Sequence, residues 1–205
     1  TKPQWGSWVV RGAWILLGYG LFASLWFLGG LADSPGLVKA MAIPAALFGA
    51  GTAGYTAFLF GQCEGRDFWQ TPLLLPTLLA QAGVGGGALG VLFGSLFDLP
   101  HDLVTAMRWL LLGSLAALGF LLATEHVSRG NTHVELAKRA MSHGVYRTRW
   151  LVGVGVGVAA AGALAILAVA TDNTPAAVAA ALCAIAGLAA YEDAFVRAGQ
   201  SVPLS

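Results

Sequence analysis

Residues 150–171 read WLVGVGVGVAAAGALAILAVAT, an apolar run that contains no charged side chain. A helix needs roughly 20 apolar residues to cross the hydrocarbon core of a bilayer, so this run is long enough to span one. The alternating Val and Gly residues at 152–158 would also suit a strand, but strands are much shorter than the run that contains them. The sequence therefore predicts a membrane-spanning helix with a face of small residues.

Five further apolar runs accompany it, in a chain of 205 residues that is 57% hydrophobic and only 10% charged, with a mean hydropathy of +0.73. Soluble domains usually carry about 25% charged residues. Membrane barrels are built from shorter strands of alternating polarity, so helices are favoured. We therefore predict an all-α, polytopic transmembrane bundle, one domain over residues 1–205. Its six helices are expected at about 8–31, 37–62, 71–97, 103–127, 150–171 and 175–196, with a basic surface loop at 128–149.

Loop charge predicts the orientation. With six helices, both chain ends lie on one side, and nine of the 11 basic residues are expected there: Lys2, Arg11, Arg66, Arg129, Lys138, Arg139, Arg147, Arg149 and Arg197. Lys39 lies on the other side and Arg108 within a helix. Positive charge in short loops marks the cytoplasmic side, so we expect a cell inner membrane protein with both ends cytoplasmic. A docking face for an acidic partner would explain the same charges.

Two local patterns bear on packing and docking. Thr132 stands three residues before Glu135 in the basic loop, which predicts a capping box and a short helix that lies on the membrane or docks a partner. In the third apolar run, Gly83, Gly87 and Gly94 belong to a series spaced mostly by four residues. Such spacing predicts close packing of helix backbones.

The polar stripe of the second predicted helix is the main candidate site. Thr52, Tyr55 and Gln62 follow steps of three and four with Leu59, so they share one helix face. At 1.5 Å per residue, Tyr55 lies about 10 Å below the basic surface. A phenol and an amide at that depth suit the oxygens of a quinone head group. Alternatively, Tyr55 hydrogen-bonds a neighbouring helix.

Other polar groups in apolar runs are costly in lipid and are candidates for proton transfer: Arg108, Glu125, His126, Glu192 and Asp193. Structural explanations remain for each. Arg108 would extend to the membrane interface, the helix-end pair Glu125 and His126 would be solvated, and one acid of the last helix would pair with Arg197. None of the four His residues lies at mid-membrane, which argues against a bis-histidine haem. We expect no haem or metal in this chain and no nucleic-acid partner.

Several short motifs resemble the polysulfide reductase membrane-subunit (NrfD) family. They are GYTAFLFGQ at 54–62, FWQTP at 68–72, GVY at 144–146 and AGQSVPLS at 198–205, and the opening WGSWVVRGAW at 5–14 is similar to the start of that family's third helix. The resemblance spans nearly the whole chain. Family members usually have eight helices, so the resemblance implies that this chain corresponds to six of them and that the first two are missing.

The resemblance also implies a function. Members bind menaquinone or ubiquinone without haem and exchange electrons with an iron–sulfur subunit, which serves a molybdenum or tungsten catalytic subunit. Tyr55 matches the tyrosine of the quinone pocket. We expect Tyr55 and Gln62, helped by Thr52 and Trp69, to hold the head group. Glu125 and Arg108 match a polar proton route.

The turn that contains Arg66 and Asp67 would face the iron–sulfur partner, and the basic loop adds Arg139 and Arg147 to the expected partner interface. The best-known members face the periplasm with their partners, whereas the basic loops here predict a cytoplasmic docking side. Either this complex faces inward, or partner binding has overridden the charge rule.

Three hypotheses follow. The first is a quinone-reactive membrane anchor of a multi-subunit oxidoreductase, which is not an enzyme alone. The second is a transporter or channel fragment with Arg108 and Glu125 along its pathway. The third is a structural anchor without a quinone site. The family likeness favours the first.

Overall fold

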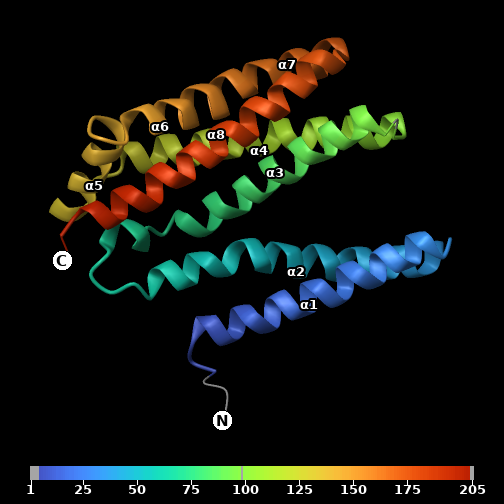
Figure 1. Ribbon diagram of the computed structural model, residues 1–205, viewed down its shortest axis with the longest axis horizontal. Coiled ribbons are helices and arrows are strands. Elements are labelled where there is room, and N and C mark those ends of the chain that lie inside the picture. The colour runs from blue at the N-terminus through green and yellow to red at the C-terminus, as the bar shows by residue number, and fades with distance from the viewer. Residues whose placement is uncertain (1–4, 98, 204–205) are drawn as a thin grey trace. The chain divides into compact units, whose positions relative to one another are not determined.

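The computed structural model describes residues 5–97 and 99–203, and these ranges contain helices joined by turns and loops, without any strand (Figure 1). Six helical segments are long and apolar enough to cross a membrane. The predicted all-α fold with six spans is therefore confirmed. The stretch of alternating Val and Gly is also helical, as expected.

The helices follow one another in a simple order. The six spans are α1 (Trp8–Leu31), α2 (Pro35–Gly61), α3 (Leu74–Leu96), α4 (His101–Val127), a continuous segment Arg147–Thr171, and α8 (Thr174–Ser201). The continuous segment comprises α6 (Arg147–Leu151), the π-helix η2 (Val152–Ala160) and α7 (Ala161–Thr171). Two shorter elements lie between spans: the 3-10 helix η1 (Asp67–Gln70) and α5 (Thr132–Ser142).

Helix ends differ from the predicted bounds where polar residues decide them. The fifth span begins at Arg147 instead of residue 150, because basic residues continue a helix beyond the apolar run. The last span runs to Ser201 instead of residue 196, and the guanidinium of Arg66 caps its end. The N-cap of α5 is Asn131 and not Thr132, because the Asn131 side chain accepts a hydrogen bond from the Val134 amide at 3.0 Å.

The described chain forms two compact units, and each has its own packing. The first unit, residues 1–63, is the hairpin of α1 and α2, joined by a short turn in which Asp33 has a positive φ of 46°. Rings of α2 lie directly on glycines of α1. A Cβ at Gly12 would stand 2.5 Å from the ring of Tyr55, so Tyr55 packs against bare backbone.

The second unit, residues 64–205, is a bundle of α3, α4, the η2–α7 segment and α8, with α5 at one end. Four glycines of α3, at 83, 87, 90 and 94, lie against α4. A Cβ at Gly87 would meet the Leu111 backbone at 2.7 Å, and one at Gly94 would meet Val104. The core between the helices is made of small and aliphatic side chains, among them Val84, Leu115 and Ala180.

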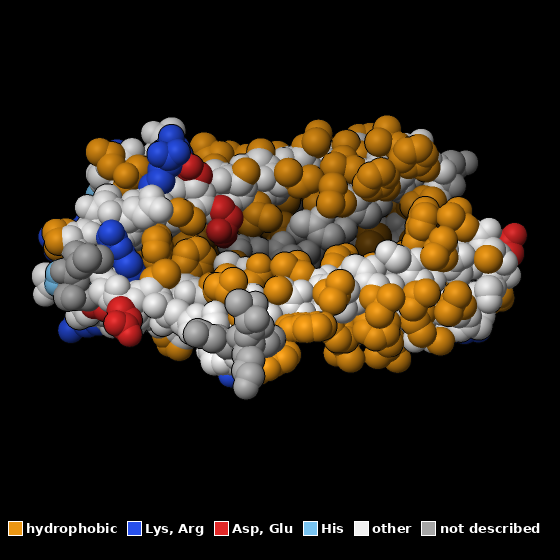
Figure 2. Space-filling view, turned by 60° about the horizontal axis from the view of Figure 1, so that its bottom comes forward, with side chains coloured by type: hydrophobic (Ala, Val, Ile, Leu, Met, Phe, Trp, Pro, Cys, Tyr) orange, Lys and Arg blue, Asp and Glu red, His pale blue; other side chains and the backbone are white. Residues whose placement is uncertain are grey.

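Hydrophobic side chains also cover the outer flanks of the helices, whereas charged side chains gather near helix ends (Figure 2). Leu47, Phe120 and Ile166 are each more than half exposed. In water such a surface would be costly, but in lipid it is the expected one. The exposed flanks therefore agree with six membrane spans.

Candidate functional site

The α2 stripe lies in the first unit and has unused hydrogen-bonding groups. Thr52 and Tyr55 are partly buried beside α1, and Gln62 is exposed at the end of α2. The Thr52 hydroxyl oxygen is buried without a hydrogen-bond partner among the described residues. The hydrogen bonds among the described residues do not include the Tyr55 hydroxyl either, whereas the Tyr55 ring packs on Gly12 of α1.

Trp69, which the sequence groups with that stripe, belongs to the second unit. Its indole is buried within η1 and packs on α8, where a Cβ at Gly199 would collide with the ring. Phe68 beside it packs on Phe195, with ring centroids 4.9 Å apart. These contacts give Trp69 a structural role, because its ring packs η1 against α8.

The second unit gathers polar groups near the end of the bundle that carries α5. Gln81 of α3 is buried and donates a hydrogen bond to Glu192 of α8 at 2.5 Å. Tyr191, the neighbour of Glu192 on α8, is 5% exposed and lines one cavity together with Glu125. Glu125 also lines a second cavity, together with Thr71. Two of the predicted proton-transfer residues thus lie in one polar cluster.

Glu125 stands between two cavities of the second unit. One, here called the apolar pocket, has a volume of about 280 Å³ and is lined mainly by hydrophobic residues of α4 and η2. The other, here called the polar cavity, has a volume of about 430 Å³ and lies beneath α5, with Gln70, Arg129 and Asn131 in its wall. Glu125, Phe68 and Lys138 line both. Glu125 thus borders both an apolar and a polar cavity.

The remaining candidates at this end have structural partners. His126 stacks on Trp150, with ring centroids 5.8 Å apart. Asp193 pairs with Arg149 at 2.8 Å and with Arg197 at 2.6 Å. The expected pairing of an acid of the last helix with Arg197 is therefore present.

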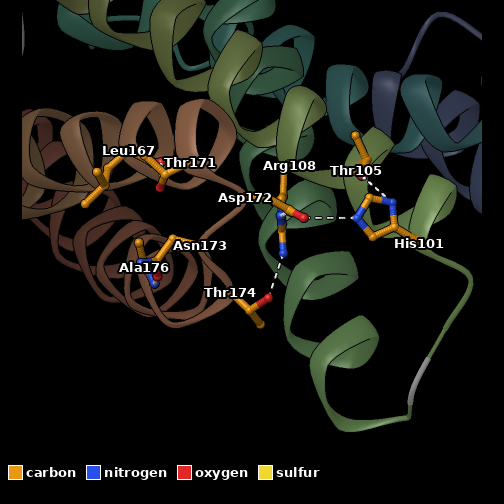
Figure 3. Close-up of polar contacts among 9 residues, drawn as sticks. All are labelled: His101, Thr105, Arg108, Leu167, Thr171, Asp172, Asn173, Thr174 and Ala176. Atoms are coloured by element: carbon orange, nitrogen blue, oxygen red, sulfur yellow. Dashed lines mark hydrogen bonds and ion pairs between the residues drawn. The ribbon is translucent and has the colours of Figure 1, made fainter.

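Arg108 lies at the opposite end of α4 from Glu125, and its side chain is buried. Its guanidinium pairs with Asp172 in the α7–α8 turn and donates to the Thr174 hydroxyl at 2.9 Å (Figure 3). His101 lies 3.3 Å from the other oxygen of Asp172. These hydrogen bonds, first that with His101 and then that with Arg108, lower the pKa of the Asp172 carboxyl.

Two of the four expected interface residues have contacts within the chain. Arg66 donates to the carbonyl oxygens of Gly199, Gln200 and Val202 at 2.7–3.1 Å, and thereby caps α8. Asp67 accepts a hydrogen bond from Asn131 at the start of α5. The other two, Arg139 and Arg147, are exposed on the α5 side of the bundle.

The described residues contain no group of three or more His, Cys, Asp and Glu side chains that could hold a metal ion. Comparison with known families gives one result: the model of "Polysulphide reductase, NrfD" matches residues 1–203. The chain belongs to the NrfD family. The resemblance seen in its motifs is therefore confirmed, and this NrfD chain is a membrane subunit of an oxidoreductase complex. Searches of curated proteins and of solved structures give no match.

Sequence reasoning missed two residues of this NrfD chain that the structure makes prominent. Gln81 was not singled out, although an amide in the middle of an apolar run is itself a signal. Asp172 was placed in a loop, and its pairing with Arg108 depends on a turn that brings together residues 64 positions apart. Of these two residues, only Gln81 could have been singled out from the sequence.

Proposed function

We propose that this chain is the quinone- and quinol-reactive membrane anchor of its complex. It would bind menaquinone or ubiquinone and exchange electrons with an iron–sulfur subunit, which serves a molybdenum or tungsten catalytic subunit. Membership of the NrfD family supports this role. The observation that carries it is the unused hydrogen-bonding capacity on α2, where the Thr52 hydroxyl is buried without a partner among the described residues.

The residues of the α2 stripe fit a quinone head chemically. Its ring oxygens accept hydrogen bonds as carbonyls and also donate them as hydroxyls, and both Tyr55 and Thr52 carry a hydroxyl that can serve either state. Gln62 adds an amide at the helix end. Small-molecule sites are typically apolar with a few placed polar groups, which is the composition of this part of α2. Trp69 remains a proposed helper of this site from the sequence analysis.

Proton exchange would accompany electron transfer, because a quinol loses two protons when it is oxidised. We assign this role first to Glu125, whose carboxyl borders both cavities, with His126 and Glu192 nearby. Asp193 and Arg108 are engaged in ion pairs, which favours a structural role for both.

We also propose a place for the chain in the cell inner membrane, with its basic ends toward the cytoplasm. Arg139 and Arg147 are exposed on the α5 side of the second unit, which suits an acidic face of the iron–sulfur partner. The charge rule for short loops supports this orientation. Arg66 and Asp67 would contribute by holding η1 and α5 in place for docking.

The test is a titration of the purified complex with a short-tailed quinol analogue, comparing wild type with Tyr55→Phe. If the phenol holds the ligand, loss of one neutral hydrogen bond should weaken binding roughly 2- to 12-fold. Tyr19→Phe is the matched control, because it removes a hydroxyl from α1 in the same unit. It should bind as wild type does.

Two other outcomes would count against the proposal in different ways. Binding that is unchanged in Tyr55→Phe would move the pocket away from the α2 stripe. A wild-type preparation with no saturable binding and no iron–sulfur partner would reject the anchor function itself.

A further inference from the structure

The apolar pocket is separate from the α2 stripe, because every residue that lines it belongs to the second unit. We propose that this pocket binds the ring head of a second neutral, quinol-type lipid, whose tail lies in the surrounding bilayer. The proposal rests on the function proposed above, since it takes the same class of ligand. It adds a second binding site, lined by residues outside the α2 stripe.

The size and lining of the pocket suit a flat ring. Its volume is about 280 Å³, and its walls include Gly119 and Leu122 of α4 and Val154, Val158 and Ala159 of η2. Small-molecule sites are mostly apolar and start at about 300 Å³, so this pocket lies just below that range. Its volume suits a ring head alone and is too small for a complete tailed lipid.

The backbone on one side of the pocket is unusual. Residues Val152–Ala160 form a π-helix, a conformation that is rare and frequently found at functional sites. Gly153 and Gly157 of this segment pack on α8, where Cβ atoms would collide with Tyr191 and Gly187. The valine that follows each of these glycines, Val154 and Val158, lines the pocket. Spacings of four residues thus give η2 two faces, with Gly153 and Gly157 toward α8 and Val154 and Val158 toward the pocket.

Four polar side chains also line the pocket: Glu125, His126, Lys138 and Tyr191. The Lys138 ammonium donates to the Ser128 carbonyl at 2.5 Å and has two further hydrogens to offer. No described residue hydrogen-bonds the Tyr191 hydroxyl. The pocket therefore offers donors for a carbonyl oxygen and, at Glu125, an acceptor for a hydroxyl.

The charges around the pocket favour a neutral head group over an anionic one. Lys138 is the only Lys or Arg among the described residues that line it; its ammonium lies 3.8 Å from Glu135, and Glu125 lines the same pocket. A lipid phosphate would therefore share the pocket with the Glu125 carboxyl and would find only one ammonium, which already faces Glu135. A quinol-type ring, which has no formal charge and carries oxygens that accept or donate, fits this set better.

The experiment uses the complete complex in nanodiscs of phosphatidylcholine, labelled with a short-tailed azidobenzoquinone and mapped by mass spectrometry. We expect saturable labelling in two places, on α2 and on the α4–η2 walls. Ala123→Phe should remove the second label and leave the first, because Ala123 lines the pocket and is exposed, so a ring fits there without disturbing the core.

Two further variants make the test specific. Ala117→Phe adds the same ring to an exposed position of α4 outside the pocket lining, and both labels should persist. Tyr191→Phe removes one hydroxyl with little change in volume, and should raise the quinone concentration needed for half-maximal α4–η2 labelling by roughly 2- to 12-fold. If Ala123→Phe fails to assemble, Tyr191→Phe alone still tests whether the ligand binds in the apolar pocket.

The outcomes separate the two proposals. Label on α2 alone overturns the second site and leaves the proposed function intact, whereas no saturable label anywhere rejects both. Label on α4–η2 that ignores both Ala123→Phe and Tyr191→Phe would reflect labelling from the bilayer and would also overturn the second site. So would a phospholipid that co-purifies with wild type and is lost in Ala123→Phe.

Discussion

At the scale of single residues, the hydrogen bond from the buried Gln81 to Glu192 gives a testable prediction. Gln81→Leu should destabilise the second unit by about 1–3 kcal/mol, because it leaves the carboxyl of Glu192 partly buried without its donor. Thermal unfolding in detergent at neutral pH measures this loss. Replacing both partners with Leu should recover most of it, since two apolar groups leave no unmet hydrogen bond. A double variant as unstable as the sum of the single ones would show that the contact is not what stabilises the pair.

At the scale of helices, close backbone approach joins η2 to α8. Gly187 lies against the backbone of Gly157, so Gly187→Val should destabilise the bundle by about 3 kcal/mol or more, at the upper end of overpacking costs. Gly155→Val is the control, because a Cβ there meets no atom within 4 Å. Thermal midpoints of both variants would check the contrast. Equal losses would mean that helix propensity and not packing decides the cost.

The turn between α7 and α8 gives a second prediction at this scale, one that depends on pH. Asp172→Asn keeps a residue that tolerates the observed φ of 50°, but it removes the negative charge that faces Arg108. Hydrogen bonds with His101 and Arg108 place the folded-state pKa of Asp172 below its unfolded value of about 3.9. The wild type should therefore be more stable above about pH 4, and its advantage should vanish as the pH falls through the folded-state pKa.

Thermal unfolding from pH 7 to pH 3 would follow this convergence. Asp33→Asn is the matched control, since Asp33 holds the same left-handed conformation in the α1–α2 turn without an ion pair to a described residue. It should change the unfolding midpoint little at any pH. A constant difference between Asp172→Asn and wild type across the range would contradict the assigned charge pairing.

At the scale of the whole molecule, hydropathy was enough to predict the six spans, because lipid requires long apolar helices and little else. The helix ends were less predictable. Residues Arg147–Arg149 and the last turn of α8 are polar yet helical, and the cap that extends α8 comes from a residue 133 positions away. Such a partner leaves no trace in local sequence.

Single residues of the candidate site were predictable from the sequence, whereas their contacts with one another were not. Tyr55 and Glu125 stand out by residue type in apolar surroundings, and so should Gln81 have done. The pairing of Gln81 with Glu192 joins positions 111 apart, and the place of Glu125 between two cavities depends on α5 and η1 as well as on its own helix. Sequence spacing reports which groups share a helix face, but it does not report which faces meet.

The contact of Arg66 with the end of α8 has a consequence for biogenesis. Helices enter the membrane in the order of their synthesis, so Arg66 is in place before α8 has been made. Until then its guanidinium lacks the three carbonyls that it finally binds, and η1 lacks the α8 surface on which Trp69 packs. Insertion of the last helix thus supplies the partners of Arg66 and of η1. A chain that stalls before α8 would expose the unpaired guanidinium of Arg66 and the uncovered ring of Trp69 to the quality-control machinery.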